Sequence, residues 1–388
     1  MVAPHPIVDH VGRQAFNSIF GDQITAGRTP DILVQFQYGI SNNDVSSTLS
    51  GTGAATNGNA TATLSTGSGV GEATLVSKDI IRYQPGFDCY CYFTAAFSAT
   101  TDADTYQRIG PHDDANGFAV GQIGGKFALI RFHEGEADDV IYPDLSKFTW
   151  SEFDPTMMNI YRVNFGWLGV APDIFEVYAG VNLGWKTLGY FEVLNVQVGP
   201  SIVQPVQPIS AEVYRGSGAG AVTLASCSWS AGRIGMGFNT ELPSNRQFGG
   251  DVAKTISGGV ETNLITIRNK TIFQGRTNRV VAHMNNVSGG VDGTKNTILR
   301  LRVGATVGGT PSWVDVDAAN SVMEYDVSGT TVSGGRVAWS AVISKVGSAS
   351  QELRFFHIRL RPGEWASVTA ESISGTDTLA SLLWLEEF

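Results

Sequence analysis

The residues of this chain that could do chemistry are few, and three of them follow one another in a polar loop. His112, Asp113 and Asp114 lie between two apolar, strand-like segments. Calcium prefers carboxylate and carbonyl oxygens, and a histidine beside carboxylates can act as acid and base. With Asn116-Gly117 behind them, the same residues also suit a turn whose carboxylates accept hydrogen bonds from backbone amides. We favour the turn and keep Asp113 and Asp114 as weak metal candidates.

The three cysteines give little support to a metal or redox site. Cys89 and Cys91 are two residues apart, which on a strand places their Cα atoms about 7 Å apart, at the limit of a disulfide. A Cys-x-Cys pair without a second pair or a nearby histidine is a weak zinc signal. With Cys227 alone in the sequence, we predict reduced, buried thiols and no cofactor.

Catalytic motifs are equally sparse. The run Gly67-Ser68-Gly69-Val70-Gly71 lacks the Lys-Ser/Thr of a phosphate loop, and no helical pattern follows it. The chain has no Gly-x-Ser-x-Gly and no His-Glu-x-x-His, and its six histidines are scattered. A glycosidase can assemble two carboxylates from distant strands, so a depolymerase remains an alternative. We predict that the protein is not an enzyme.

Composition indicates strands and turns. Glycine contributes 46 of 388 residues, about 12% against an average of about 7%. The formal charge of −10 argues against nucleic acid as a partner. No run of about 18 apolar residues is present, so we expect no membrane insertion. The N-terminal residues lack the basic and apolar regions of a secretory signal, which predicts synthesis in the cytoplasm.

Three segments alternate in the manner of strands: 80–93, 117–132 and 159–169. Many short strands with turns every 8 to 12 residues favour an all-β protein with sandwich or jelly-roll domains. We assign most aromatic residues of these strands to the core. Three tryptophans placed at loops or strand ends are kept as possible glycan contacts: Trp150, Trp185 and Trp313.

The chain is longer than one hydrophobic core usually organises, which predicts two sandwich domains behind an extended arm. We place the arm at residues 1–40, the first sandwich at 41–235 and the second at 236–388. The arm cannot bury its own apolar residues, so we expect it to dock on a neighbouring subunit or, alternatively, on its own sandwich. Its contact residues would be Phe16, Ile19, Phe20, Phe36 and Tyr38.

Several segments in one order resemble a virion structural domain of tailed bacteriophages, related copies of which occur in large DNA viruses. The resemblance covers roughly residues 75–230. Its motifs here are Tyr83-Gln84-Pro85-Gly86, Phe93-Thr94-Ala95, Ile109-Gly110, Asn116-Gly117-Phe118, Asp154-Pro155-Thr156, Phe165-Gly166-Trp167-Leu168-Gly169 and the Pro-containing stretch 204–213. The Trp-Asn acidic motif that this family often carries ahead of Asp-Pro-Thr is replaced here by residues 148–153. The chain end, 361–388, resembles a C-terminal module of phage structural proteins.

This resemblance implies a non-enzymatic component of the virion, on the tail, baseplate or capsid surface, of the fibre, spike or decoration type. Such a protein would assemble with other virion proteins and as a homo-oligomer, with a trimer as our guess, through its arm and sheet edges. The alternative is an adhesin of the same particle that binds a host-surface glycan.

Overall fold

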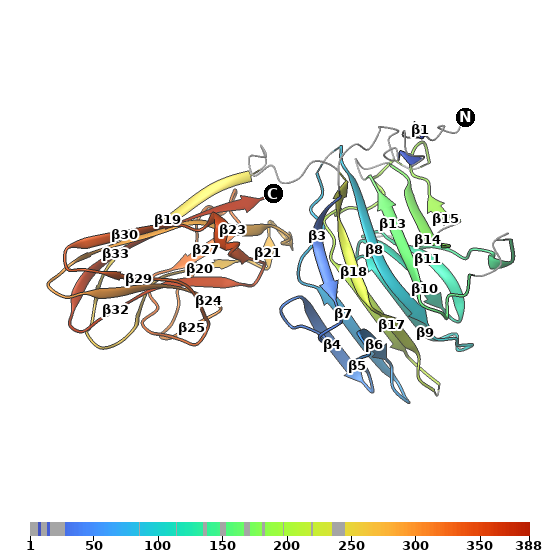
Figure 1. The fold of residues 1–388 in the computed structure, drawn as a ribbon, viewed down its shortest axis with the longest axis horizontal. Coiled ribbons are helices and arrows are strands. Elements are labelled where there is room, and N and C mark those ends of the chain that lie inside the picture. The colour runs from blue at the N-terminus through green and yellow to red at the C-terminus, as the bar shows by residue number, and fades with distance from the viewer. Residues whose placement is uncertain are drawn as a thin grey trace. The chain divides into compact units, whose positions relative to one another are not determined.

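The computed structural model describes residues 7–8, 14–15, 28–84, 86–113, 115–134, 138–147, 153–166, 171–180, 183–196, 198–218, 220–234 and 245–388. The chain divides into two compact units, Met1–Phe238 and Asn239–Phe388, and each has its own core. Strands dominate, and the helices of the described residues are two short 3-10 turns, η1 (Leu145–Lys147) and η2 (Arg354–Phe356) (Figure 1). The predicted all-β fold of two sandwiches is confirmed. Nowhere in these ranges is a helix long and apolar enough to cross a membrane.

One layer of unit 1 is an antiparallel sheet of seven strands in the order β12-β11-β10-β9-β16-β7-β4. Its strands are β4 (Val45–Gly51), β7 (Gly71–Ser77), β9 (Thr105–Pro111), β10 (Gly117–Ile123), β11 (Lys126–Phe132), β12 (Asp139–Ile141) and β16 (Ile209–Arg215). β4 and β12 are the two edges of this sheet.

The other layer has nine strands, seven of them in the order β15-β14-β13-β8-β17-β6-β5, while β18 pairs with β8 and β3. The strands are β3 (Arg28–Gln35), β5 (Ala54–Gly58), β6 (Thr61–Ser65), β8 (Asp88–Phe97), β13 (Asn159–Phe165), β14 (Asp173–Tyr178), β15 (Trp185–Phe191), β17 (Thr223–Ser226) and β18 (Ser228–Ile234). A separate pair joins β1 (Ile7–Val8) to β2 (Gln14–Ala15).

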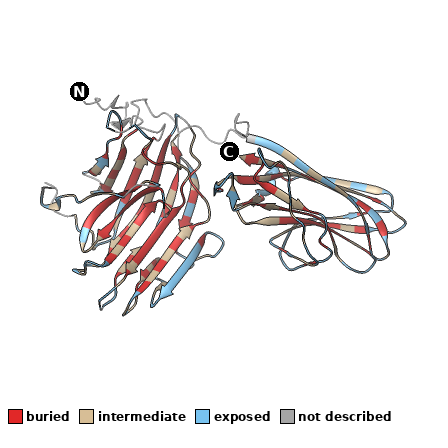
Figure 2. Ribbon diagram, turned by 180° about the vertical axis from the view of Figure 1, so that it is seen from behind, coloured by how far each residue is buried: buried red, intermediate tan, exposed pale blue. Residues whose placement is uncertain are grey.

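Alternation along these strands separates a core face from an outer face. On β8 the side chains of Cys89, Cys91 and Phe93 are buried in the core between the sheets. Figure 2 shows buried and partly exposed positions along the strands of unit 1. Both cysteines are free thiols, and burial raises the pKa of each thiol well above its ordinary value. Tyr161 of β13 stacks on Phe93 at 5.7 Å, which is the core role expected for the aromatic strands.

The second half of the expected arm is part of unit 1's sheet. β3 pairs along its length with β18, and its Ile32 and Val34 are buried in the same core as Phe36. Phe36 meets Trp229 of β18 edge to face at 5.2 Å. The boundary at residue 40 therefore needs correction, because apolar residues that alternate along β3 complete the sandwich of their own chain.

Unit 2 is a second sandwich. Its first sheet runs β19-β33-β23-β30, with β31 beside β23, and its second runs β26-β27-β20-β32-β24-β29. The strands of the first are β19 (Asn245–Ile256), β23 (Val281–Asp292), β30 (Gly347–Glu352), β31 (Arg359–Leu360) and β33 (Thr376–Glu387). Those of the second are β20 (Thr262–Asn269), β24 (Thr297–Val303), β26 (Val314–Asp315), β27 (Met323–Asp326), β29 (Arg336–Ile343) and β32 (Trp365–Ser372). Two short pairs join β21 (Ile272–Phe273) to β22 (Arg276–Thr277) and β25 (Thr306–Val307) to β28 (Val332–Ser333).

The last strand of the chain, β33, is an interior strand of unit 2. β33 lies between β19 and β23, and its Trp384 is fully buried. The Trp384 Nε1 donates a hydrogen bond to Glu386 Oε1 at 2.9 Å. The backbone amide of Val322 donates to the other Glu386 oxygen at 2.8 Å. Phe388 packs against Phe273 with ring centroids 5.8 Å apart. The last residues of the chain are therefore held by contacts within unit 2.

Candidate functional site

The outer surface of the nine-stranded sheet carries a cluster of aromatic and charged side chains across β8, β13, β14 and β15. These four strands lie side by side in Figure 1. The cluster consists of Tyr92, Arg162, Glu176, Tyr178 and Trp185, and we call it the aromatic face. None of the five belongs to the buried apolar core, whose residues alternate with them along the same strands.

Trp185 is at the centre of the aromatic contacts. Its ring lies 5.3 Å from the ring of Tyr92 at an interplanar angle of 62°, and 5.5 Å from the ring of Tyr178 at 56°. The guanidinium carbon of Arg162 lies 4.3 Å from the centroid of the Trp185 ring. Trp185 and Tyr92 are partly exposed, and Tyr178 is 36% exposed. The three rings therefore reach solvent, and two of them, Trp185 and Tyr92, contact the same cation.

A carboxylate on the neighbouring strand holds that cation in place. Arg162 donates from Nε to Glu176 Oε2 at 2.6 Å and pairs with it through Nη2 at 2.5 Å. Asn164 Nδ2 donates to the same oxygen at 2.9 Å. A third arginine nitrogen, Nη1, donates to the hydroxyl of Tyr92 at 3.3 Å. The charge of Arg162 is compensated, and its guanidinium is held against the Trp185 ring.

Strand register brings these residues together. Arg162 of β13 is directly opposite Tyr92 of β8 on one side and opposite Glu176 of β14 on the other. Tyr178 of β14 is opposite Trp185 of β15, and a bulge between Phe175 and Glu176 shifts the pairing of these two strands. Directly opposite side chains on one face of a sheet lie close enough to contact, so local pairing is sufficient to build the cluster.

Of the three tryptophans proposed from the sequence, Trp185 lies in the aromatic face and Trp313 lies in unit 2. Trp313 has a related environment, with the guanidinium carbon of Arg268 4.0 Å from its ring centroid. Arg268 in turn donates from Nε to Glu324 at 2.6 Å. Trp150 lies outside the described residues. Four residues of the aromatic face were missed: Tyr92, Arg162, Glu176 and Tyr178. An arginine at an outward position inside the apolar strand 159–165 was a usable signal.

Asp113 has the role of a turn residue. Its Oδ1 accepts hydrogen bonds from the amides of Ala115 at 2.9 Å and Asn116 at 2.7 Å. Asp114 lies outside the described residues. Within the described ranges, no group of three or more His, Cys, Asp or Glu residues is arranged to hold a metal ion. The carboxylate of Asp113 is thus occupied by the backbone of its own loop.

The proposed contact residues of the arm fall into two groups. Phe16, Ile19 and Phe20 lie outside the described residues, and their docking role stays a prediction. Phe36 is buried in unit 1, as described above, whereas Tyr38 in the following turn is 94% exposed. Tyr38 is therefore the described residue of this set that can contact another molecule.

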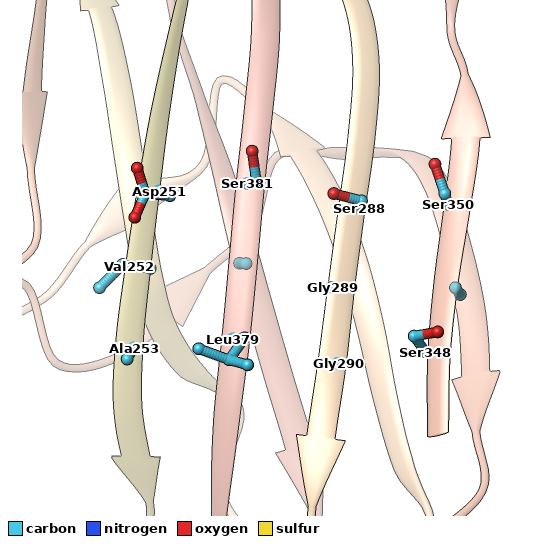
Figure 3. A pocket seen from close by; sticks show the side chains of 12 residues that line it. Asp251, Val252, Ala253, Ser288, Gly289, Gly290, Ser348, Ser350, Leu379 and Ser381 are labelled. Atoms are coloured by element: carbon cyan, nitrogen blue, oxygen red, sulfur yellow. The ribbon is translucent and has the colours of Figure 1, made fainter. Parts of the chain in front are cut away.

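Unit 2 carries a trough of about 470 Å³ on the outer surface of the sheet β19-β33-β23-β30. Figure 3 shows its lining, in which Asp251, Ser381, Ser288 and Ser350 stand beside one another on four successive strands. Gly289, Gly290 and small side chains make up most of the floor. Hydroxyl groups and one carboxylate are present there, but the lining has no aromatic ring.

Comparisons with known proteins give distant structural matches. No family model and no curated protein matches the chain. Among solved structures, a glycosyl hydrolase family protein from Mycobacterium fortuitum matches with 10% identity and a TM-score of 0.37 over 52% of this chain and 99% of that chain. The Emp47p carbohydrate recognition domain matches with 12% identity and a TM-score of 0.37 over 56% and 100%. The CBM2 module of the evolved Dit of Lactobacillus casei BL23 phage J-1 matches with 7% identity and a TM-score of 0.35 over 55% and 99%. At this distance the matches carry no argument about function.

Proposed function

We propose that this protein is a bacteriophage virion component, on the tail, baseplate or capsid surface, that attaches to host glycans through the aromatic face of unit 1. The observation that carries the glycan part is the partly exposed group of Tyr92, Trp185 and Tyr178, in which Trp185 contacts the other two rings and the guanidinium of Arg162. Its virion setting rests on the motif resemblance between residues 75 and 230.

The chemistry of the aromatic face suits a sugar. A pyranose ring has flat C–H surfaces, which pack on aromatic rings, and hydroxyl groups, which exchange hydrogen bonds with phenol, amide and charged side chains. Trp185 and Tyr178 supply ring surface, and the Tyr92 hydroxyl supplies a polar group. Binding sites of small ligands typically combine aromatic walls with a few placed polar groups.

We further propose that binding occurs without hydrolysis. A glycosidase of the common type needs two carboxyl groups about 5 to 9.5 Å apart, one of them free to donate a proton. Among its five described residues the aromatic face holds one carboxylate, Glu176, and its Oε2 accepts hydrogen bonds from Arg162 and Asn164. Release of reducing ends from host polysaccharide by the purified protein would contradict this part of the proposal.

Binding of the purified full chain to host cells and to a glycan array tests the proposal. We expect Trp185→Ala to lower affinity about ten-fold or more, because truncating an aromatic anchor typically costs about 2 kcal/mol. Trp313→Ala makes the same change at the second tryptophan candidate, which also stacks on a Glu-bound arginine but lies in unit 2, and it should leave binding through the aromatic face unchanged. Tyr178→Ala gives a second test should Trp185→Ala lower the melting temperature. Equal binding by wild type, Trp185→Ala and Tyr178→Ala would overturn the glycan proposal.

A further inference from the structure

Arg28 places a second guanidinium beside the aromatic face. It is the first residue of β3 and is exposed, and its guanidinium carbon lies 4.8 Å from the ring centroid of Tyr92 and 5.7 Å from that of Tyr90. The same Tyr92 ring lies 5.8 Å from the guanidinium carbon of Arg162. Tyr92 therefore stands between two arginines that come from opposite directions, one from β3 and one from β13.

The two arginines differ in charge compensation. Arg162 is bound to Glu176, whereas Arg28 has no carboxylate within ion-pair distance among the described residues. Arg233, which also lies near β3, is paired with Asp31. Among the described residues Arg28 thus has no ion-pair partner, and its guanidinium carries five N–H donors at the border of the aromatic face. The whole chain carries a net charge of −10, so this cation is a local feature and not part of a generally basic surface.

Stacking on tyrosine fixes the guanidinium plane while leaving its edge available. A planar guanidinium donates two parallel hydrogen bonds to a carboxylate or phosphate, and such charge-assisted bonds are about twice as strong as neutral ones. We infer that the aromatic face selects acidic glycans, with Arg28 binding an anionic group of the sugar while Trp185 and Tyr178 pack against its ring. This inference rests on the proposed function and adds the chemical class of its ligand.

The test compares matched acidic and neutral sugars on the full-length protein. We would measure binding of oligogalacturonides, of the same oligosaccharides after reduction of their carboxyl groups, and of polyglycerol phosphate as the phosphate-bearing probe. We expect the carboxylated or the phosphorylated probe to bind at least about ten-fold more tightly than the reduced one at low salt, with the preference shrinking at 1 M salt. Which anionic probe is preferred identifies the source of the negative charge.

Substitutions at Arg28 separate this inference from the proposed function. We expect Arg28→Gln to remove the preference for acidic probes and leave neutral binding unchanged, and Arg28→Lys to keep part of the preference. If Trp185→Ala lowers binding while Arg28→Gln does not, or if acidic and reduced probes bind equally, charge selection is wrong and the glycan-binding function stands. If no glycan binds to any variant or to the wild type, both proposals fail together.

Discussion

The guanidinium of Arg162 lies 4.3 Å from the centre of the Trp185 ring and is bound at the same time by the carboxylate of Glu176. Arg162 and Glu176 have only 10% and 13% of their side-chain surface exposed. This contact joins three adjacent strands and orients the tryptophan that we propose to contact sugar. The same relation recurs in unit 2, where Arg268 lies opposite Glu324 and under Trp313.

Removing Glu176 should therefore destabilise unit 1 and disorder Trp185. We expect Glu176→Gln to cost about 1.5–3 kcal/mol, because hydrogen bonds to a charged group are lost and Arg162 keeps a poorly solvated charge. Urea unfolding followed by tryptophan fluorescence measures this cost. Arg162→Met combined with Glu176→Gln should recover part of it, since no unpaired charge remains. If the double variant is less stable than the summed costs of Glu176→Gln and Arg162→Met predict, this explanation is wrong. Glu324→Gln is the control in unit 2.

A deletion series tests the corrected boundary of the arm. Deleting residues 1–40 should abolish cooperative unfolding of unit 1, because it removes Ile32, Val34 and Phe36 from the core and β3 from its pairing with β18. Deleting residues 1–27 removes no described core residue and should leave that transition in place. Phe36→Ala alone should cost about 3–5 kcal/mol and identifies the transition of unit 1. If the protein lacking residues 1–40 folds normally, the arm boundary first predicted at residue 40 is right and our correction is wrong.

The fold class could be predicted from the sequence because apolar and polar residues alternate along the strands. Apolar residues at every second position of β8, β13 and β14 meet in one core, and the sequence showed this pattern directly. The arm was misplaced because the strand 28–35 is separated in sequence from its partner β18 by nearly the whole of unit 1. Short-range patterns contain no information about such a pairing.

The candidate site could be predicted only in part. Trp185 is recognisable as a tryptophan at a strand start, whereas its neighbours depend on register. Tyr92 and Arg162 are 70 positions apart in the chain, and their contact follows from the pairing of β8 with β13. A sequence pattern predicts that such residues lie on the outer face of their strands. It does not predict which of them contact each other.

An unprotected edge supports the proposed assembly through sheet edges. β4 is the edge strand of the seven-stranded sheet, six of its seven residues are exposed, and its sequence VSSTLSG has neither a charge nor a proline. Natural sheets usually guard exposed edges with lysine, proline or bulges. We expect Leu49→Lys, at a side chain that is 50% exposed, to reduce self-association measured by light scattering. Leu379→Lys, at a side chain that is 56% exposed on the interior strand β33 of unit 2, is the comparison. A wild-type protein that stays monomeric at high concentration would rule out this edge as a homomeric contact.

Asp173 predicts how the stability of unit 1 depends on pH. Its carboxyl group is fully buried, and neither oxygen has a hydrogen-bond partner among the described residues. Burial raises the pKa of Asp173 well above its ordinary value, and the charge of Arg131 offsets this only in part. A carboxyl group with a raised pKa in the folded state favours folding while it is protonated. The stability it contributes is lost as the pH rises above about 4, the usual pKa of the unfolded state, and through the folded-state pKa.

Asp173→Asn cannot ionise and should not show this loss. We therefore expect the stability of the variant relative to wild type to rise as the pH increases above about 4, and to level off above the folded-state pKa of Asp173. Urea unfolding at several pH values measures the difference in the transition that Phe36→Ala identifies as unit 1. Asp251→Asn, at an exposed carboxylate of unit 2, controls for the change in net charge. A difference between Asp173→Asn and wild type that stays constant over this range would mean that ionisation of Asp173 is not coupled to folding.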